Sequence, residues 1–399
     1  MSTEETAVGA VAGPVKRTTP ESSSLTDRVV AVDALRMLLV AWVIGCHALL
    51  GYAVIGGWPY DEVAEVHLPP EVELVLAVIL GPTALFVIGT FFFLAGMFAP
   101  GERSRHGTGG FVRRRTVRLG LPWLSFVVLL WPACMWMAYR AAGYDISFGE
   151  AFLRRQPFLD SGPLWFAQVL LYISIAYALW ARFGVRHAGW SPSRPPVIGP
   201  RTLVLMILLI AGTSFLVRLW FPARSQQVLD LHLWQWPQCA GMFALGVLVS
   251  SQGWQRRVPD EIARWCWRAV LAVLATALVV MLAFGVGDLA RDGTPFLGGL
   301  HLQAAALAVV EAVLVVAGSV ALLHLAQSRL SSPGSALIRC ARGAFVAYVL
   351  QAPVLIGLSV VLRPLPLPAL VKALTVGIVG VAVCLGIGAI LTSRRRRVR

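Results

Sequence analysis

Arg36 and His47 stand eleven residues apart in Val29–Ile55, the first long apolar stretch of the chain. Eleven residues of α-helix advance by about 16 Å and turn three times plus roughly 20°, so both side chains are expected on one face. Asp33, three residues before Arg36, shares that face and can hold the guanidinium. Ionisable groups inside a membrane helix are costly to bury, so these three residues are predicted to form a site.

The chemistry that suits this trio is proton transfer beside a fixed positive charge. Desolvation favours the neutral imidazole, which can accept a proton near pH 7, so His47 is predicted to be a general base. Arg36 would support negative charge near it. Two alternatives stay open: His47 can be a histidine bonded between packed helices, and Asp33 can be only an ion-pair partner.

The composition is that of an integral membrane protein. The 399 residues are 57% hydrophobic and 14% charged, with a mean hydropathy of +0.73, which excludes a soluble globular protein. Apolar runs repeatedly reach the roughly 20 residues needed to cross a bilayer. We therefore expect an all-α polytopic membrane protein, a bundle of about ten transmembrane helices. The expected spans are 29–54, 74–99, 119–139, 162–181, 201–221, 236–251, 268–287, 300–325, 337–361 and 367–392. Kinks are expected at Pro82, Pro122, Pro132, Pro237 and Pro353.

Charge alternates between successive loops and predicts the topology. One set of loops is basic: Arg103, Arg105, Arg113–Arg115, Arg182, Arg186, Arg194, Arg256, Arg257, Arg264, Arg329, Arg339 and Arg394–Arg397. The other set is acidic: Asp61, Glu62, Glu65, Glu71, Glu73, Asp145, Glu150, Asp160, Asp288 and Asp292. Because cytoplasmic loops are rich in arginine, both termini are predicted to be cytoplasmic, with the protein in the plasma membrane. The net charge of +14 is thus a topology signal rather than a sign of nucleic-acid binding.

Three regions follow from this pattern. Residues 1–28 are predicted to be a disordered cytoplasmic tail, 29–393 the transmembrane domain, and 394–399 a basic cytoplasmic tail. The six cysteines are scattered through apolar segments and show no metal-ligand spacing with histidine, so no metal site is predicted.

A series of short motifs follows in a fixed order along the chain. The motifs are Asp33–Arg36 with His47 after ten residues, Phe91–Gly96, Arg113–Arg118, Gly162–Phe166, Phe243–Gly246 and Ala347–Pro353. In this order the chain resembles the acyltransferase-3 family of integral membrane O-acyltransferases, over nearly its whole length from Val29. There are two departures. Ala95 stands where the family often has serine, and Gln351 stands where it often has histidine, which argues against a second imidazole from the ninth span.

The resemblance implies transfer of an acyl group, acetyl above all, from an acyl-CoA donor to a hydroxyl. The acceptor would be a carbohydrate, glycan, lipid or secondary metabolite, and no permanently bound cofactor is implied. Arg115 and Arg118 fit the family's Arg-x-x-Arg and, with Arg114, would bind the phosphates of CoA. The alternative is that these arginines serve only cytoplasmic retention of their loop.

Trp165, Glu311 and Gln351 are the predicted acceptor-side residues, each with an alternative role. Trp165 is either a sugar-stacking platform or an anchor at the membrane interface. Glu311, well inside a span, either orients His47 or binds acceptor hydroxyls, or pairs with an arginine of another helix. Gln351 either donates to an acceptor oxygen or bonds between helices.

Two other classes of protein remain possible from the sequence. A transporter that exports a glycan or an acylated intermediate also uses intramembrane Arg, His and Glu, although no paired inverted repeat is evident. A membrane scaffold for a biosynthetic complex would not need the buried charges. A covalent change in the cargo distinguishes the enzyme from the transporter.

Overall fold

The computed structural model describes residues 20–54, 58, 60, 66–154, 159–187, 198–223, 225, 231–284, 294–330 and 334–397. Every regular element in these ranges is helical. Eight of the described helical segments are long and apolar enough to cross a membrane. The expected all-α polytopic membrane fold is therefore confirmed.

The individual helices follow the expected spans closely. The long helices are α1 (Pro20–Leu50), α2 (Pro70–Arg115), α6 (Trp165–His187), α7 (Pro200–Arg218), α8 (Trp236–Ser250), α9 (Asp260–Phe284), α12 (Leu302–Val313), α13 (Ser319–Arg329), α14 (Ser335–Leu362) and α15 (Ala369–Arg397). Shorter ones are α3 (Leu121–Ser125), α4 (Trp131–Ala141), α5 (Phe148–Leu153) and α11 (Thr294–Leu297). The π-helical turns η2 (Thr116–Gly120), η3 (Phe126–Leu130) and η7 (Leu314–Gly318) and the 3₁₀ turns η4 (Gly162–Leu164) and η6 (Leu233–Gln235) complete the described elements.

Two features separate the eight segments from the predicted ten spans. One continuous apolar segment, Leu80–Ala141, contains the third predicted span and most of the second. It turns at Gly107, whose φ of 68° interrupts the helix at a residue that needs no Cβ clearance. The sixth predicted span is α8, whose 15 residues are short for a straight bilayer crossing. The count of ten and the cytoplasmic termini stay predictions.

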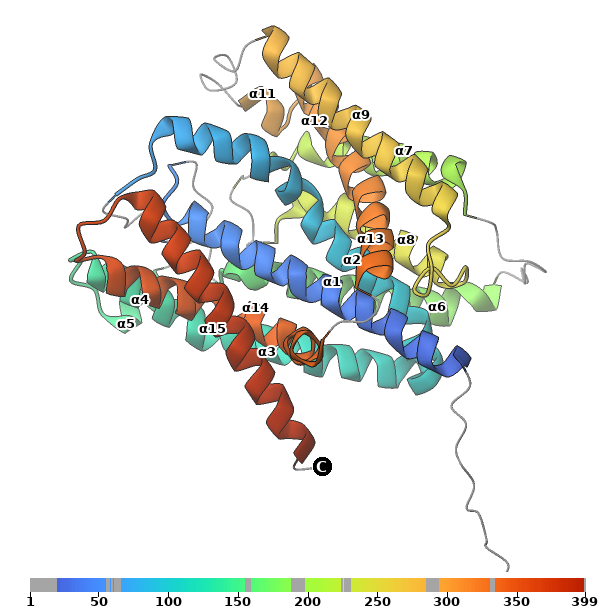
Figure 1. Cartoon of the computed structure of the whole chain (residues 1–399), viewed down its shortest axis with the longest axis horizontal. Coiled ribbons are helices and arrows are strands. Elements are labelled where there is room, and N and C mark those ends of the chain that lie inside the picture. Colours follow the sequence, from blue (N-terminus) through green and yellow to red (C-terminus); the bar gives the residue numbers. More distant parts are fainter. Residues whose placement is uncertain are drawn as a thin grey trace, which may run out of the picture.

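α1 runs through the middle of the bundle (Figure 1). It packs against both α14 and α15, which also pack extensively against each other, whereas α2 packs against α8 and α6, and α7 against α12. Backbones touch at two crossings. A Cβ on Gly343 of α14 would overlap the backbone of Gly388 of α15, and one on Gly96 of α2 would overlap Phe243 O of α8. Small residues of this kind let membrane helices approach closely.

The π turns adjoin prolines inside the long segment from α2 to α4. Leu121, just before Pro122, donates its backbone N–H to Thr116 O five residues back, and Trp131 does the same before Pro132. Proline lacks an N–H and its ring crowds the preceding turn, so a wider turn lets the helix continue past it. Pro122 and Pro132 are thereby accommodated without ending the segment.

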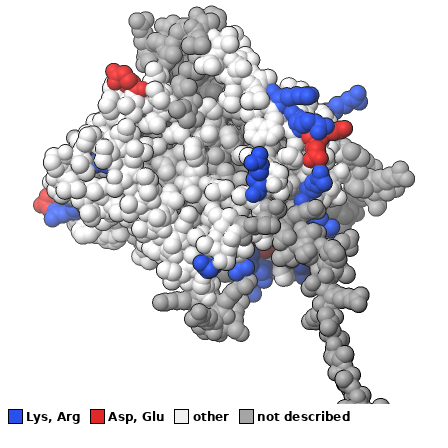
Figure 2. Space-filling view, viewed as in Figure 1, with Lys and Arg blue, Asp and Glu red and all other residues white. Residues whose placement is uncertain are grey.

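On the face drawn in Figure 2, the charged side chains of the described residues lie mostly at the edges. Figure 2 shows a broad uncharged middle, with most of the blue side chains on the side of the view where α1 begins and along the lower edge. Residues 1–19 of the predicted tail lie outside the described residues, and α1 begins at Pro20. Arg194, Asp61, Glu62, Glu65, Asp288 and Asp292 also lie outside them.

Candidate functional site

His47 stands in the last turn of α1 and meets α14 through Gln351. His47 Nδ1 lies 2.9 Å from Gln351 Oε1, and the Gln351 side chain is fully buried. The sequence singled out both residues but did not predict that they touch. Within the described part of the chain nothing hydrogen-bonds to His47 Nε2, so one ring nitrogen is held and the other is available.

Trp58 covers one face of the His47 ring. The two ring centroids are 4.5 Å apart and the planes are inclined by 20°, and Trp58 is almost completely buried. The edge of Trp131 meets Trp58 at 6.3 Å, and Trp131 Nε1 donates to Asp160 at 2.7 Å. Gly162 has a φ of 45°, and a Cβ there would lie 2.7 Å from the Trp131 ring. Sequence reasoning missed both tryptophans: Trp58 lies outside the regular helices, and the contact of Trp131 with it depends on how distant segments pack.

Two of the sequence motifs meet next to this imidazole. Tyr348, three residues before Gln351 on α14, donates its hydroxyl hydrogen to Pro163 O at 2.7 Å. Its ring packs edge-on against Phe166 with a centroid distance of 4.6 Å. The contact joins the motif at the start of α6 to the motif on α14, three residues before the Gln351 that touches His47.

Trp165, the predicted sugar platform, has one ring face covered. It stacks on His232 with the centroids 4.4 Å apart and an interplanar angle of 21°. His232 adopts a left-handed backbone conformation with φ 47°, and its ring also lies 6.3 Å from that of Trp234. Trp165 is therefore part of a layered aromatic cluster.

Arg36 is held by three groups on α1 and α2. Its Nη1 pairs with Asp33 Oδ1 at 3.3 Å, its Nη2 donates to Leu94 O at 3.4 Å, and its Cζ lies 5.0 Å above the Phe98 ring. The predicted anchoring by Asp33 is present. Leu94 belongs to the motif that ends at Gly96, so that motif supplies a carbonyl to the arginine of the first motif.

Glu102 gathers the predicted donor-binding arginines. Its carboxylate lies 3.0 Å from Arg115 Nη2, 3.6 Å from Arg114 Nε and 3.7 Å from Arg118 Nη1. Arg36 is also near enough to Arg115 for the two charges to interact. One carboxylate cannot neutralise this group of guanidiniums, so the cluster remains electropositive and suits a multiply charged anion. No pattern in the sequence distinguishes Glu102 from its basic surroundings.

Glu311 pairs with Arg218 of α7, one of the alternatives that its sequence position left open. Both side chains are buried, with 7% and 2% of their surfaces exposed. Arg218 Cζ lies 5.2 Å from the Trp234 ring, which places the pair beside the aromatic cluster. Arg218 Nε and Nη1 have no hydrogen-bond partner among the described residues.

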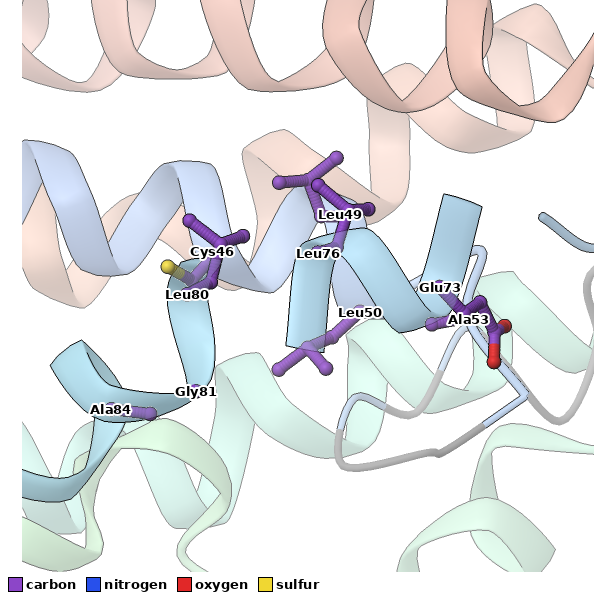
Figure 3. A pocket seen from close by; sticks show the side chains of 9 residues that line it. All are labelled: Cys46, Leu49, Leu50, Ala53, Glu73, Leu76, Leu80, Gly81 and Ala84. Carbon is purple, nitrogen blue, oxygen red and sulfur yellow. The ribbon is translucent and has the colours of Figure 1, made fainter. Parts of the chain in front are cut away.

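An apolar groove flanks α1 next to the turn that carries His47 (Figure 3). Its volume is about 180 Å³. The lining comes from the end of α1 and the first turns of α2: Cys46, Leu49, Leu50, Ala53, Glu73, Leu76, Leu80, Gly81 and Ala84. Glu73 is the one charged residue among them, and its carboxylate accepts the Val54 N–H. The groove therefore favours hydrocarbon over a polar molecule.

Comparison with known proteins gives one match. A family model described as an acyltransferase domain, that of the acyltransferase-3 family, matches residues 29–392. No curated protein and no solved structure matches the chain. The matched region includes every site residue described above.

Proposed function

The chain belongs to the acyltransferase-3 family of membrane acyltransferases, and we propose that it transfers an acyl group from acyl-CoA to a hydroxyl with His47 as general base. Acetyl is the proposed group. The proposed acceptor is a hydroxyl of a carbohydrate, glycan, lipid or secondary metabolite. The observation that carries the proposal is the environment of His47, whose Nδ1 is held by Gln351 while Nε2 has no partner among the described residues.

The proposed acyl transfer needs only His47, the acceptor hydroxyl and the thioester of acyl-CoA. His47 Nε2 takes the proton of the acceptor hydroxyl as its oxygen attacks the thioester carbon. The carbon–sulfur bond then breaks, the thiolate of CoA leaves, and the imidazolium returns the proton to that sulfur. The products are an ester and free CoA. No acyl-enzyme is needed.

Arg36 is proposed to act on the donor side of His47. Along α1 the two residues are separated by about 16 Å of helix rise. Arg36 is anchored by Asp33 and Leu94 O and remains one-third exposed, so it can meet a ligand without losing its supports. We propose that it steers the pantetheine arm or supports negative charge on the thioester oxygen.

The cluster around Glu102 is the proposed entrance for CoA. Arg114, Arg115 and Arg118 would bind phosphate oxygens through charge-assisted hydrogen bonds. Arginine-rich loops face the cytoplasm, where acyl-CoA is found, so we propose that this end is cytoplasmic and that the protein lies in the plasma membrane with both termini inside.

Gln351 is the acceptor-side residue that the geometry supports best, because it touches His47. Trp165 and Glu311 are proposed to shape the acceptor entrance through their contacts with His232 and Arg218. An acceptor hydroxyl would approach His47 at Nε2, the ring nitrogen that does not bond to Gln351.

The test is mass spectrometry of glycans, lipids and small metabolites from cells that lack the protein. These cells are complemented with the wild type, with His47→Ala or with the control His324→Ala, which removes a histidine that pairs with Asp260 far along the chain. We expect a product heavier by one acyl group with the wild type and the control, and none with His47→Ala. Equal product from His47→Ala would refute the general base. An unchanged mass, with a compound moved between cytoplasm and medium, would indicate a transporter.

A further inference from the structure

We infer that Gln351 and Tyr348 are positioning residues that fix His47 in the tautomer protonated on Nδ1, leaving the Nε2 lone pair for the acceptor. The inference deepens the proposed function and rests on it for its chemical meaning. Its structural basis is a chain of polar groups that runs from Pro163 through α14 to α1. The donor and the acceptor of each hydrogen bond in this chain follow in turn from Pro163 O, which can only accept.

Pro163 O fixes the first step of this chain. A carbonyl oxygen can only accept a hydrogen bond, so Tyr348 must use its single hydroxyl hydrogen on Pro163 O, at 2.7 Å. The Tyr348 oxygen is then left with lone pairs only. It faces any further neighbour as an acceptor.

The Gln351 amide is the second step. Tyr348 and Gln351 are three residues apart on α14 and share one face of the helix. Within the described part of the chain the Gln351 amino group is buried without a hydrogen-bond partner, on the face of α14 that also carries Tyr348. If the amide were turned round, its carbonyl oxygen would face the lone pairs of Tyr348. The orientation with the amino group towards Tyr348 is favoured because it avoids this repulsion.

The imidazole is the last step. In that orientation Gln351 Oε1 faces His47 Nδ1 at 2.9 Å, and an amide oxygen can only accept. Nδ1 must therefore carry the proton. In the neutral ring the other nitrogen is then the base, and Nε2 is the nitrogen with no partner among the described residues. The stack on Trp58 holds the ring plane.

Glutamine is suited to position 351 because its amide oxygen accepts a hydrogen bond from His47 Nδ1. A second imidazole would need its own tautomer to be set, whereas an amide oxygen with a fixed orientation sets that of His47 without any proton transfer. Loss of this acceptor is expected to reduce turnover by about 10²–10⁴-fold, as wrong tautomers do elsewhere. Binding of acyl-CoA should be unchanged, since Gln351 is not part of the cluster around Glu102.

The experiment is nitrogen NMR of the purified full chain with ¹⁵N-labelled histidine, without substrate, together with steady-state kinetics. The His47 signals are assigned by their loss in His47→Ala. We expect a protonated Nδ1 and an unprotonated Nε2 in the wild type. Gln351→Leu should lose this preference and lower kcat with KM for acyl-CoA unchanged. Gln351→Glu keeps an oxygen that accepts from Nδ1 and should retain the tautomer, with a smaller fall in kcat than Gln351→Leu because its second oxygen faces the Tyr348 lone pairs.

Tyr348→Phe tests the orientation of the amide. We expect a mixture of tautomers and a smaller fall in kcat, about tenfold, because the amide can then adopt both orientations. The matched control is Tyr172→Phe, which removes a tyrosine hydroxyl bonded to another buried glutamine, Gln168, at 3.0 Å. It should change neither tautomer nor kcat.

A protonated Nε2 in the wild type, or an unchanged tautomer in Gln351→Leu, would overturn the inference. The tautomer is measured without turnover. The result therefore tests the inference about Gln351 and Tyr348 independently of the proposed function. Acyl transfer that survives in His47→Ala would remove the function while leaving the tautomer result in place.

Discussion

Glu102 and Arg115 form a nearly buried ion pair, with Oε2 and Nη2 3.0 Å apart and only 15% and 12% of the two side chains exposed. Arg118, which faces the same carboxylate at 3.7 Å, is 62% exposed. The two arginines of the Arg-x-x-Arg motif therefore differ in role. Arg115 is part of the packed structure, whereas Arg118 reaches outwards.

This difference predicts two distinct phenotypes. Arg118→Ala should raise KM for acyl-CoA about tenfold with little loss of stability, because an exposed ion pair contributes little to folding. Arg115→Ala should raise KM and also destabilise the protein by about 1–3 kcal/mol, since Glu102 loses its closest partner. Kinetics and thermal unfolding in detergent measure both effects. The control is Arg105→Ala, which removes an exposed arginine of the same segment whose Nε donates to Gly101 O. An acyl thioester without phosphates should show no change of KM in either variant.

Arg36 should not be replaceable by lysine. Its two terminal nitrogens bond in different directions, to Asp33 and to Leu94 O, and a single ammonium cannot hold both while it faces a ligand. We expect Arg36→Lys to fold and to lose about 10² in kcat, and Asp33→Asn to lose less. Comparison of kcat and KM with the wild type measures this. Full turnover in Arg36→Lys would show that charge alone suffices at this position.

The buried pair of Arg218 and Glu311 should contribute to stability only when both members are present. Removal of one member leaves an uncompensated charge, so Glu311→Ala or Arg218→Ala is expected to destabilise by about 3–5 kcal/mol. The double variant Arg218→Met with Glu311→Leu should recover most of this loss, because well-packed apolar groups can replace a buried ion pair. Thermal unfolding checks the prediction, and single variants as stable as the wild type would contradict it. In the folded double variant, KM for the acceptor then measures any contact that Glu311 makes.

The crossing of α2 and α8 should not tolerate even a methyl group. A Cβ on Gly96 would overlap Phe243 O, and one on Gly246 would overlap Phe93 O, so the obstacles are backbone atoms that cannot rotate away. We expect Gly96→Ala and Gly246→Ala to destabilise by at least about 1–3 kcal/mol and to lower the yield of folded protein. Gly212→Ala on α7, where a Cβ would meet nothing within 4 Å, is the matched control. It should leave yield and stability unchanged.

The sequence predicted the parts of the site that depend on helical periodicity. Asp33 holds Arg36 because residues three apart on a helix are neighbours, and this follows from local geometry alone. For Glu311 the sequence leaves an arginine of another helix as one of several possible partners, and it cannot name Arg218, since pairing between helices depends on their packing. The same limit hid the contact between His47 and Gln351.

What the sequence missed lies in loops and in irregular turns. Trp58 lies outside the regular helices, and no pattern of residues predicts its contact with His47. In the sequence Glu102 is an ordinary charge just after the predicted span 74–99, and its role depends on the approach of Arg114, Arg115 and Arg118 in the folded chain. The π turns before Pro122 and Pro132 let the chain continue where a proline is expected to end or bend a helix.

α1 carries Arg36 and His47 on one continuous helix, so the distance between the two side chains along the helix axis is fixed. In the proposed reaction the thioester must lie at His47 while the phosphates lie near Arg115, beyond Arg36. The donor must therefore extend over at least the 16 Å or so of helix rise between the two residues. A single residue inserted between them would lengthen the helix between Arg36 and His47 by only about 1.5 Å. It would also rotate His47 by about 100° about the helix axis, away from Gln351. The separation of eleven residues between Arg36 and His47 thus determines the direction of the imidazole as well as its distance from Arg36.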